Sequence, residues 1–309
     1  MAVRAQPAKP TPPRARVKAR SSEGAETMLR QSATARWIQV VALLVLAIVF
    51  LIPLAWTIVT SFRSADAITR GSIGWIPQPF TTENYSTILS DPQNPVGRWF
   101  VNSLGVSVVA TALTLVVASL AAYALSRLTF PGRDVIFLVL LSSMLIPPVL
   151  LTIPLYNEFA NAIPNYSMID TYWPLILPYA SGVFGVFLLR QFYIQIPKDL
   201  DEAAMIDGAG KFGRWFRVIL PLSQSALLTL GILTFMGVYN DYLGPLLFTQ
   251  SPEMRTVTVG IAIVTQGSYT NNYGALMAFS AVAALPVILM FLALQRHFVG
   301  SSALSGVKG

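Results

Sequence analysis

Residues 196–221 read IPKDLDEAAMIDGAGKFGRWFRVILP and form a charged segment between long uncharged stretches. Eight charged side chains lie within these positions, although the whole chain has only 21 Lys and Arg and 14 Asp and Glu. Because a charged side chain is costly in the hydrocarbon of a bilayer, the charged segment is predicted to lie outside it. Asp199 followed by Glu202 is typical of a capped helix start. The small residues Ala203 and Ala204 then let another protein approach this helix closely.

The composition of the chain predicts an integral membrane protein. It has 309 residues, of which 54% are hydrophobic and 11% charged, and its mean hydropathy is +0.60, whereas soluble domains average about 25% charged residues. The absence of cysteine excludes a disulfide framework, a thiol nucleophile and a cysteine metal site. The net charge of +7 does not predict a nucleic-acid partner, because much of it comes from a basic tail over 1–35, which we expect to be disordered.

Six windows almost free of charge predict six membrane-spanning helices, since about 20 apolar residues suffice to cross a bilayer. They lie at about 37–62, 99–126, 135–157, 171–190, 217–241 and 274–296. Together they define a transmembrane domain over 36–297, followed by a C-terminal tail over 298–309. The third and fourth windows contain Pro147, Pro148, Pro154, Pro174 and Pro178. Proline removes a backbone donor, and these residues indicate either packing kinks or a bent, hydrated pathway.

The basic residues predict the orientation of the chain in the membrane, because loops rich in Lys and Arg stay in the cytoplasm. With a cytoplasmic N-terminus, the inner segments hold nine Lys and Arg even without the basic tail, and the outer loops hold four. We therefore expect a multi-pass protein with both termini in the cytoplasm. The charged segment then faces the cytoplasm as well.

The chain offers little that could catalyse a reaction. Gly208, Gly210 and Gly213 satisfy G-x-G-x-x-G, but an acidic helical segment precedes them instead of the strand that a dinucleotide site requires. Met205 stands where a Walker A loop needs its first glycine. The only histidine, His297, is expected at the membrane interface, and no cluster of titratable residues predicts a catalytic site, a metal or a bound cofactor.

Charge within the predicted spans is also scarce, which disfavours an ion-coupled secondary carrier, the alternative from another class. Asp241 closes the fifth window, where it either anchors the end of a helix or lines a polar pathway. Tyr239, Asn240 and Asp241 are the first candidates for a substrate path, and Asn102 and Ser103 are weaker ones. The energy for transport must then come from outside the predicted spans. The charged segment is the evident place at which another protein could supply it.

The charged segment resembles the cytoplasmic signature of permease subunits from binding-protein-dependent ABC importers. That signature reads E-A-A, three residues, G, nine residues, I, one residue, L-P. The matching residues are Glu202, Ala203, Ala204, Gly208, Leu220 and Pro221, with Val218 in place of the isoleucine. Residues 124–133, 187–192, 239–241 and 306–309 further resemble the carbohydrate branch of this family, and in particular the second permease subunit of the maltose-type group.

This resemblance implies an all-α permease of the type I importer fold that pairs with a second permease subunit as a heterodimer in the bacterial cytoplasmic membrane. Two ATPase subunits would bind ATP and Mg, and an extracytoplasmic sugar-binding protein would deliver the substrate. The chain itself would be neither an enzyme nor a cofactor-binding protein. A neutral mono- or oligosaccharide is the expected cargo, because the predicted spans show no basic pocket, and a glycerol-phosphate or polyol importer is the alternative.

The resemblance also implies which residues couple the chain to the ATPase. A coupling helix over 199–213 would dock on the ATPase through Glu202, Ala203, Ala204, Asp207, Gly208, Ala209, Gly213, Leu220 and Pro221. A second ATPase contact is implied for the tail residues Gly306, Val307, Lys308 and Gly309.

Overall fold

The computed structural model describes residues 33–71, 74–267 and 272–305. Most of the expected basic tail, and the expected ATPase contact at 306–309, lie outside these residues. The described chain is helical apart from turns, loops and two isolated β-bridges, so the all-α expectation is confirmed. The described chain divides into two compact units between Ala55 and Trp56, and the two units are described separately.

Several helices are long and apolar enough to cross a membrane. Four candidate spans are α2 (Ala33–Ser61), α5 (Val96–Arg127), the pair α8 (Trp173–Ala180) and α9 (Val183–Gln195), and α16 (Tyr273–Ser305). Two more arise if each bent pair counts as one span. The first bent pair joins α6 (Arg133–Ser143) to η1 (Pro148–Leu151) and α7 (Thr152–Asn161). The second joins α11 (Lys211–Arg214), η2 (Trp215–Ile219) and α12 (Leu220–Leu222) to α13 (Gln224–Tyr239).

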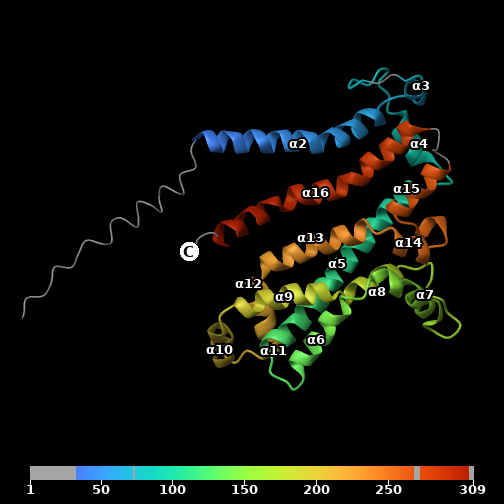
Figure 1. Ribbon diagram of the computed structural model, residues 1–309. Coiled ribbons are helices and arrows are strands. Elements are labelled where there is room, and N and C mark those ends of the chain that lie inside the picture. Colours follow the sequence, from blue (N-terminus) through green and yellow to red (C-terminus); the bar gives the residue numbers. More distant parts are fainter. Residues whose placement is uncertain (1–32, 72–73, 268–271, 306–309) are drawn as a thin grey trace, which may run out of the picture. The chain divides into compact units, whose positions relative to one another are not determined.

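Short helices fill the ends of the second unit. They are α3 (Ala65–Thr69), α4 (Glu83–Ser90), α10 (Lys198–Ile206), α14 (Leu243–Phe248), η3 (Pro252–Met254) and α15 (Val257–Gln266). Figure 1 shows α10 and α11 at the end where α5 finishes, and α4 and α15 at the opposite end, where α5 begins. The charged segment is therefore separated from the α4–α15 end by the length of α5.

The third expected span differs from a single helix over 135–157. Helix α6 ends at Ser143, and the chain bends by 92° before it continues into η1 and α7. Pro147 and Pro148 lie at this bend, and neither has the N–H that would continue the α6 ladder. These prolines therefore break the helix, which is a larger effect than the packing kink that was one of the two expectations for them.

The fifth expected span, over 217–241, is also interrupted. Residues Trp215–Ile219 form a π-helical turn, closed by the Leu220 N–H on the Trp215 carbonyl, and α13 starts after an 81° bend. Pro221 has no N–H and cannot donate to the carbonyl of residue 217. The wider π-helical turn therefore costs no hydrogen bond at Pro221.

The fourth and sixth spans also differ from expectation, the fourth in its middle and the sixth at its end. The fourth is divided into α8 and α9 at Ser181 and Gly182, whose backbones leave the helical ladder. Helix α16 continues to Ser305, so the first part of the expected tail over 298–309 is helical.

Helix α5 is the centre of the second unit. It contributes to all three buried apolar clusters, which pack it against α9 and α13, against α15 and α16, and against α8 and α14. Small residues on its buried face allow this close packing. A Cβ at Gly185 of α9 would lie 3.1 Å from the Cβ of Ala118, which shows how closely α9 approaches α5.

Asp170 fixes the loop that precedes α8. Its N–H donates to the Phe248 carbonyl at 2.8 Å, and its Oδ1 accepts from the N–H groups of Gln250 at 2.8 Å and Ser251 at 3.0 Å. Burial raises the pKa of the Asp170 carboxyl, but hydrogen bonds from the Ser251 and Gln250 N–H groups and from the Ser251 side chain together outweigh burial and hold the pKa below its ordinary value. The loops before α8 and after α14 are thereby joined.

We expect Asp170→Asn to lower stability in a pH-dependent way. Because the pKa is lower in the folded state, the carboxylate stabilises the fold fully above its ordinary pKa of 3.8, and this contribution is lost as the pH falls through the folded-state pKa. Thermal unfolding in detergent from about pH 7 to about pH 3 should show a constant deficit for Asp170→Asn above about pH 5 that shrinks in acid. Asp66→Asn, at an exposed carboxylate of α3, is the control. A deficit that does not change with pH would contradict this prediction.

Candidate functional site

Helix α10 forms the first part of the charged segment. It begins at Lys198, with Pro197 at the N-cap and no capping side chain. The expectation that Asp199 caps the helix, with Glu202 completing a capping box, is therefore wrong. Pro197 already has the extended backbone of a cap (φ −55°, ψ 137°), which places Asp199 and Asp201 inside the first turn. Their negative charges there favour the helix through its dipole.

Gly208 ends α10. Its φ of +82° is left-handed, and the N–H groups of Gly208 and Ala209 donate to the carbonyls of Met205 at 3.1 Å and Ala204 at 2.9 Å. These two bonds are the Schellman pattern, which uses glycine at the left-handed position. The coupling helix predicted over 199–213 is therefore two short helices, because the chain turns at Gly208 before α11 begins at Lys211.

The surface of the charged segment is partly apolar. Its exposed large apolar side chains are Leu200, Met205, Ile206, Phe212 and Phe216. Ile206 is 86% exposed, and the rings of Phe212 and Phe216 stack with a centroid distance of 6.5 Å. An apolar patch of this kind marks a surface on which another protein can pack. These side chains were not among the predicted site residues, although their position among charged residues could have indicated them.

The predicted coupling residues differ in how far they reach this surface. Those that are exposed are Glu202, Ala203, Asp207, Gly208 and Pro221. Those that are half-buried are Ala204, Ala209, Gly213 and Leu220. The small side chains thus lie beside the apolar patch, and part of their area packs within the segment itself.

A buried arginine holds the base of the charged segment, and sequence reasoning missed it too. Arg127, at the end of α5, forms an ion pair with Asp201 of α10 at 3.1 Å, and the two side chains are only 5% and 11% exposed. Arg127 also donates to the carbonyls of Tyr193 and, at 2.6 Å, of Ile196 at the end of α9. The final turns of α5 and α9 and the first turn of α10 therefore meet at one side chain.

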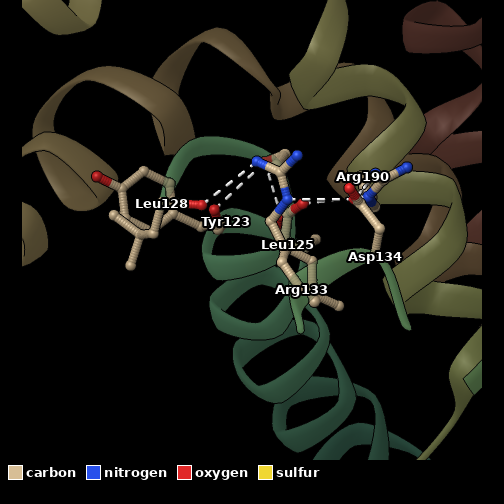
Figure 2. Close-up of polar contacts among 8 residues, drawn as sticks. Tyr123, Leu125, Leu128, Arg133, Asp134 and Arg190 are labelled. Carbon is tan, nitrogen blue, oxygen red and sulfur yellow. Dashed lines mark hydrogen bonds and ion pairs between the residues drawn. The ribbon is translucent and has the colours of Figure 1, made fainter. Parts of the chain in front are cut away.

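A second arginine makes the opposite connection, as Figure 2 shows. Arg190 of α9 donates to the Leu125 carbonyl of α5 at 3.2 Å, lies 3.7 Å from Asp134 of α6, and stacks over the Phe137 ring at 3.9 Å. Arg133 adds a 3.2 Å contact with the same Asp134 oxygen. The end of α5 is therefore joined to both α6 and α9.

A cavity of about 480 Å³ lies between α5, η1, α7, α8, α9, α13 and α14. Its wall carries the aromatic rings of Tyr179, Phe184 and Phe248, and the hydroxyls of several threonines. Asp241 is the only charged residue among the described residues of this wall. Its Oδ2 accepts the Tyr179 hydroxyl at 2.8 Å, so the carboxylate is held at the cavity from α8.

The other two residues of the expected 239–241 path do not line this cavity. The Tyr239 side chain is buried, and its hydroxyl donates to the Ala283 carbonyl of α16 at 2.9 Å. The Asn240 side chain donates back to the Met236 carbonyl of α13 at 2.9 Å. Of the three candidates, only Asp241 is therefore placed to meet a molecule in the cavity.

Asn102 and Ser103 also lie elsewhere. Asn102 Nδ2 donates to the carbonyls of Glu253 at 2.6 Å and Arg255 at 2.9 Å, and Ser103 Oγ accepts the Val257 N–H at 2.9 Å. Both side chains are buried. They hold the loop between η3 and α15 against α5, and the structure does not place them on the cavity wall.

Known proteins resemble the chain along most of its length. Residues 114–301 match the model of the family described as "Binding-protein-dependent transport system inner membrane component". The trehalose/maltose transport system permease protein MalG of Thermococcus litoralis is 34% identical over 283 residues, which cover 91% of this chain and 100% of that protein. The arabinooligosaccharides transport system permease protein AraQ of Halalkalibacterium halodurans is 32% identical over 275 residues, which cover 88% and 96%.

A solved structure has the same fold. A permease chain from a bacterial ABC transporter that imports the acidic polysaccharide alginate superposes with a TM-score of 0.74 at 21% identity, covering 87% of this chain and 99% of its own. At that identity the likeness concerns the fold, and it confirms the expected type I importer permease architecture. The family model and the two relatives extend the likeness to the sequence itself, so the chain belongs to the inner membrane components of binding-protein-dependent transport systems and is a multi-pass permease subunit.

Proposed function

We propose that this chain is one permease subunit of an ATP-driven importer of a neutral sugar, and that it is driven through the charged segment. The observation that carries the proposal is the short helix α10, which ends at Gly208 beside an exposed apolar patch and is bound at its base to α5 and α9. The two relatives are named as permeases for trehalose or maltose and for arabinooligosaccharides, which supports a sugar as cargo.

In this proposal the ATPase packs on α10 and on the turn at Gly208. The residues involved are Glu202, Ala203, Ala204, Asp207, Gly208, Ala209, Gly213, Leu220 and Pro221, together with the exposed Met205, Ile206 and Phe212. Closure of the ATPase dimer on ATP favours one of the two conformations of the permease, because the ATPase binds ATP more tightly in its closed form. The tail residues 306–309 add a second contact.

The proposed assembly contains a second permease subunit, two ATPase subunits and a sugar-binding protein on the outer side of a bacterial cytoplasmic membrane. The excess of basic residues in the segments that include 196–221 supports a cytoplasmic position for that segment and for both termini. A related alginate importer has been solved in complex with a periplasmic protein that carries a pentasaccharide, which supports an external binding protein.

The cavity supports a neutral cargo over an anionic one. Its volume of about 480 Å³ lies within the range of small-molecule sites, roughly 300–1,000 Å³. The Asp241 carboxylate can accept hydrogen bonds from sugar hydroxyls, whereas it repels a phosphate or a carboxylate. No lysine or arginine occurs among the described residues of the wall, which disfavours glycerol phosphate.

Reconstitution in proteoliposomes tests this function. The two permeases, the ATPases and the binding protein should together take up one of maltose, trehalose or arabinotriose when ATP is present on the ATPase side. Uptake should stop when the ATPase subunits or ATP are left out. Equal uptake without ATP, or uptake driven by an ion gradient, would contradict the proposal.

We expect Asp241→Asn to change which sugars are moved. The amide still accepts the Tyr179 hydroxyl, so the fold is kept, but the charge that excludes anions is gone. The ratio of uronic-acid trisaccharide uptake to neutral trisaccharide uptake should therefore rise severalfold, which corresponds to about 1 kcal/mol. Asn240→Ala, next to it but off the cavity wall, is the control and should leave the ratio unchanged. A ratio that stays the same in Asp241→Asn would contradict the role of Asp241.

A further inference from the structure

We propose that Arg127 is a positioning residue that makes α10, α5 and α9 move together, and that its ion pair with Asp201 carries the motion of α10 to the cavity. This inference rests on the proposed docking of an ATPase on the charged segment. Arg127 acts on the transported molecule only through these helices, since it does not lie on the cavity wall.

The chemistry of Arg127 suits this role. Its planar guanidinium has five N–H donors in a fixed fork, so one side chain can bind the Tyr193 and Ile196 carbonyls and the Asp201 carboxylate at once. Both members of the ion pair are almost fully buried, so water screens their attraction little. The loss of one partner would leave a buried charge without compensation.

Without this ion pair, α10 would be joined to α9 only along the chain, while its other contacts are with α11 and η2, which follow it. Only Ile196 and Pro197 separate the two helices along the chain, and both have extended backbone angles. A push on α10 could then be absorbed by rotation at these two residues. The contact between Asp201 and Arg127 opposes that rotation, because it joins the first turn of α10 to the last turn of α5.

Helices α5 and α9 also hold each other at this end. Arg127 of α5 donates to the last carbonyls of α9, and Arg190 of α9 donates to the Leu125 carbonyl of α5, as Figure 2 shows for the second contact. Each arginine donates to carbonyls at the C-terminal end of the partner helix, and each places its positive charge at the negative end of the partner's dipole. The two helix ends therefore form one rigid unit.

This rigid unit reaches the cavity. Thr114 of α5 and Phe184 and Gly185 of α9 lie on the cavity wall. A displacement of α10 that Arg127 passes to both helices therefore shifts two parts of the wall in the same direction. A displacement passed along the backbone to α9 alone would shift only one.

The cluster around Arg127 also has hydrogen-bonding capacity to spare. Four buried atoms have no hydrogen-bond partner among the described residues: Tyr123 Oη, Arg127 Nε, Asp201 Oδ1 and Arg214 Nε. Arg127 and Asp201 are joined by their 3.1 Å ion pair, and Tyr123 lies one helical turn before Arg127 on α5. Buried polar atoms are usually paired, so four unpaired atoms in one cluster are unusual. These atoms are free to form new hydrogen bonds within the cluster as α10 moves, so the cluster can exchange partners without exposing a charge.

The test uses the full complex, assembled with Asp201→Asn or with the matched control Asp199→Asn. Both substitutions remove one negative charge from the first turn of α10, but Asp199 is exposed and Asp201 is held by Arg127. The chain has no native cysteine, so Thr234→Cys on the cavity wall is a unique labelling site within it. The measurements are the ATP-dependent change in the maleimide labelling rate of this cysteine and the rate of ATP hydrolysis.

In the parent complex and in Asp199→Asn, ATP should change the labelling rate severalfold. In Asp201→Asn, ATP hydrolysis should persist, while the ATP-dependent change in labelling should fall to less than about a third. Asp201→Glu should restore part of the change, because it restores the charge. Arg127→Lys should behave between these extremes, because it keeps the charge but loses the fork.

Two results would overturn the inference. One is an ATP-dependent labelling change in Asp201→Asn that equals that of the control. The other is a parallel loss of ATP hydrolysis and labelling change in Asp201→Asn with no rescue by glutamate, since that pattern indicates damage to the fold. If the parent complex itself shows no ATP-dependent labelling change, the proposed coupling function fails, which is distinct from a failure of the role of Arg127.

Discussion

Gly208→Val should lower ATP-driven transport by at least about tenfold while the subunit still reaches the membrane. The φ of Gly208 is +82°, a left-handed conformation that costs a β-branched residue about 1–2 kcal/mol or more. Valine would therefore undo the Schellman turn and let α10 continue past residue 208. The surface formed by α10, the turn and α11 would lose its shape, and with it the proposed ATPase contact. Transport and co-purification of the ATPase with the variant complex measure this effect.

Two further variants at this position separate backbone conformation from other causes. A Cβ at Gly208 would meet no atom of the described chain within 4 Å, so the substitution creates no internal clash. Asn tolerates the left-handed region and should cause the smallest defect. Asp has nearly the same shape as Asn but adds a charge to the proposed docking surface, so it should abolish transport and weaken ATPase association. Full activity of the valine variant, or an asparagine variant as defective as valine, would contradict the backbone argument.

Gly260→Ala should cause the largest loss of stability. Gly260 of α15 lies so close to Trp99 of α5 that a Cβ would overlap the indole ring. Trp99 is fully buried, and its Nε1 donates to the Pro252 carbonyl at 2.6 Å. Overpacking costs about 1–3 kcal/mol and a displaced, unpaired indole N–H about 1–3 kcal/mol more. We therefore expect the apparent unfolding temperature in detergent to fall by roughly 5–15 °C.

The matched control for this prediction is Gly105→Ala in α5. It is the same change within a helix, but a Cβ at Gly105 would meet no atom within 4 Å. Alanine is favoured over glycine in helices by about 1 kcal/mol, so this variant should unfold at the same temperature or a higher one. Equal unfolding temperatures for Gly260→Ala and Gly105→Ala would show that the contact between α15 and α5 is looser than the structure indicates.

Features determined by neighbouring residues could be predicted from the sequence. The charged segment, its small residues and the glycine that turns the chain all follow from local composition and spacing. The helical class also follows, because long apolar windows admit few alternatives in a membrane. From the sequence, the prolines between 147 and 178 did not distinguish packing kinks from a bent pathway. The structure places Pro148, Pro174 and Pro178 on the cavity wall, which favours the bent-pathway interpretation over simple packing kinks.

Contacts between distant residues could not be predicted in this way. Helices α6 to α9 lie between Arg127 and Asp201 in the sequence, and no periodic pattern links the two residues. Asn102 and Ser103 seemed candidates for a polar path because they are polar within an apolar window. Asn102 and Ser103 hydrogen-bond to backbone atoms of residues 253–257, and Asn102 also accepts the Tyr172 hydroxyl. A backbone partner cannot be recognised from the sequence.

The central position of α5 has a consequence for how such a permease can diversify. Because three buried clusters share this helix, a one-residue insertion in it would rotate the following residues by about 100° and misplace side chains in each cluster beyond it. Thr114 is the only described residue of α5 on the cavity wall, and the rest of the wall comes from α7, α8, α9, α13, α14 and the segments between them. Substitutions that adapt the cavity to a new sugar can therefore accumulate in those elements while α5 stays constant, at wall positions other than Leu175, Leu230 and Phe248, which also belong to the buried clusters.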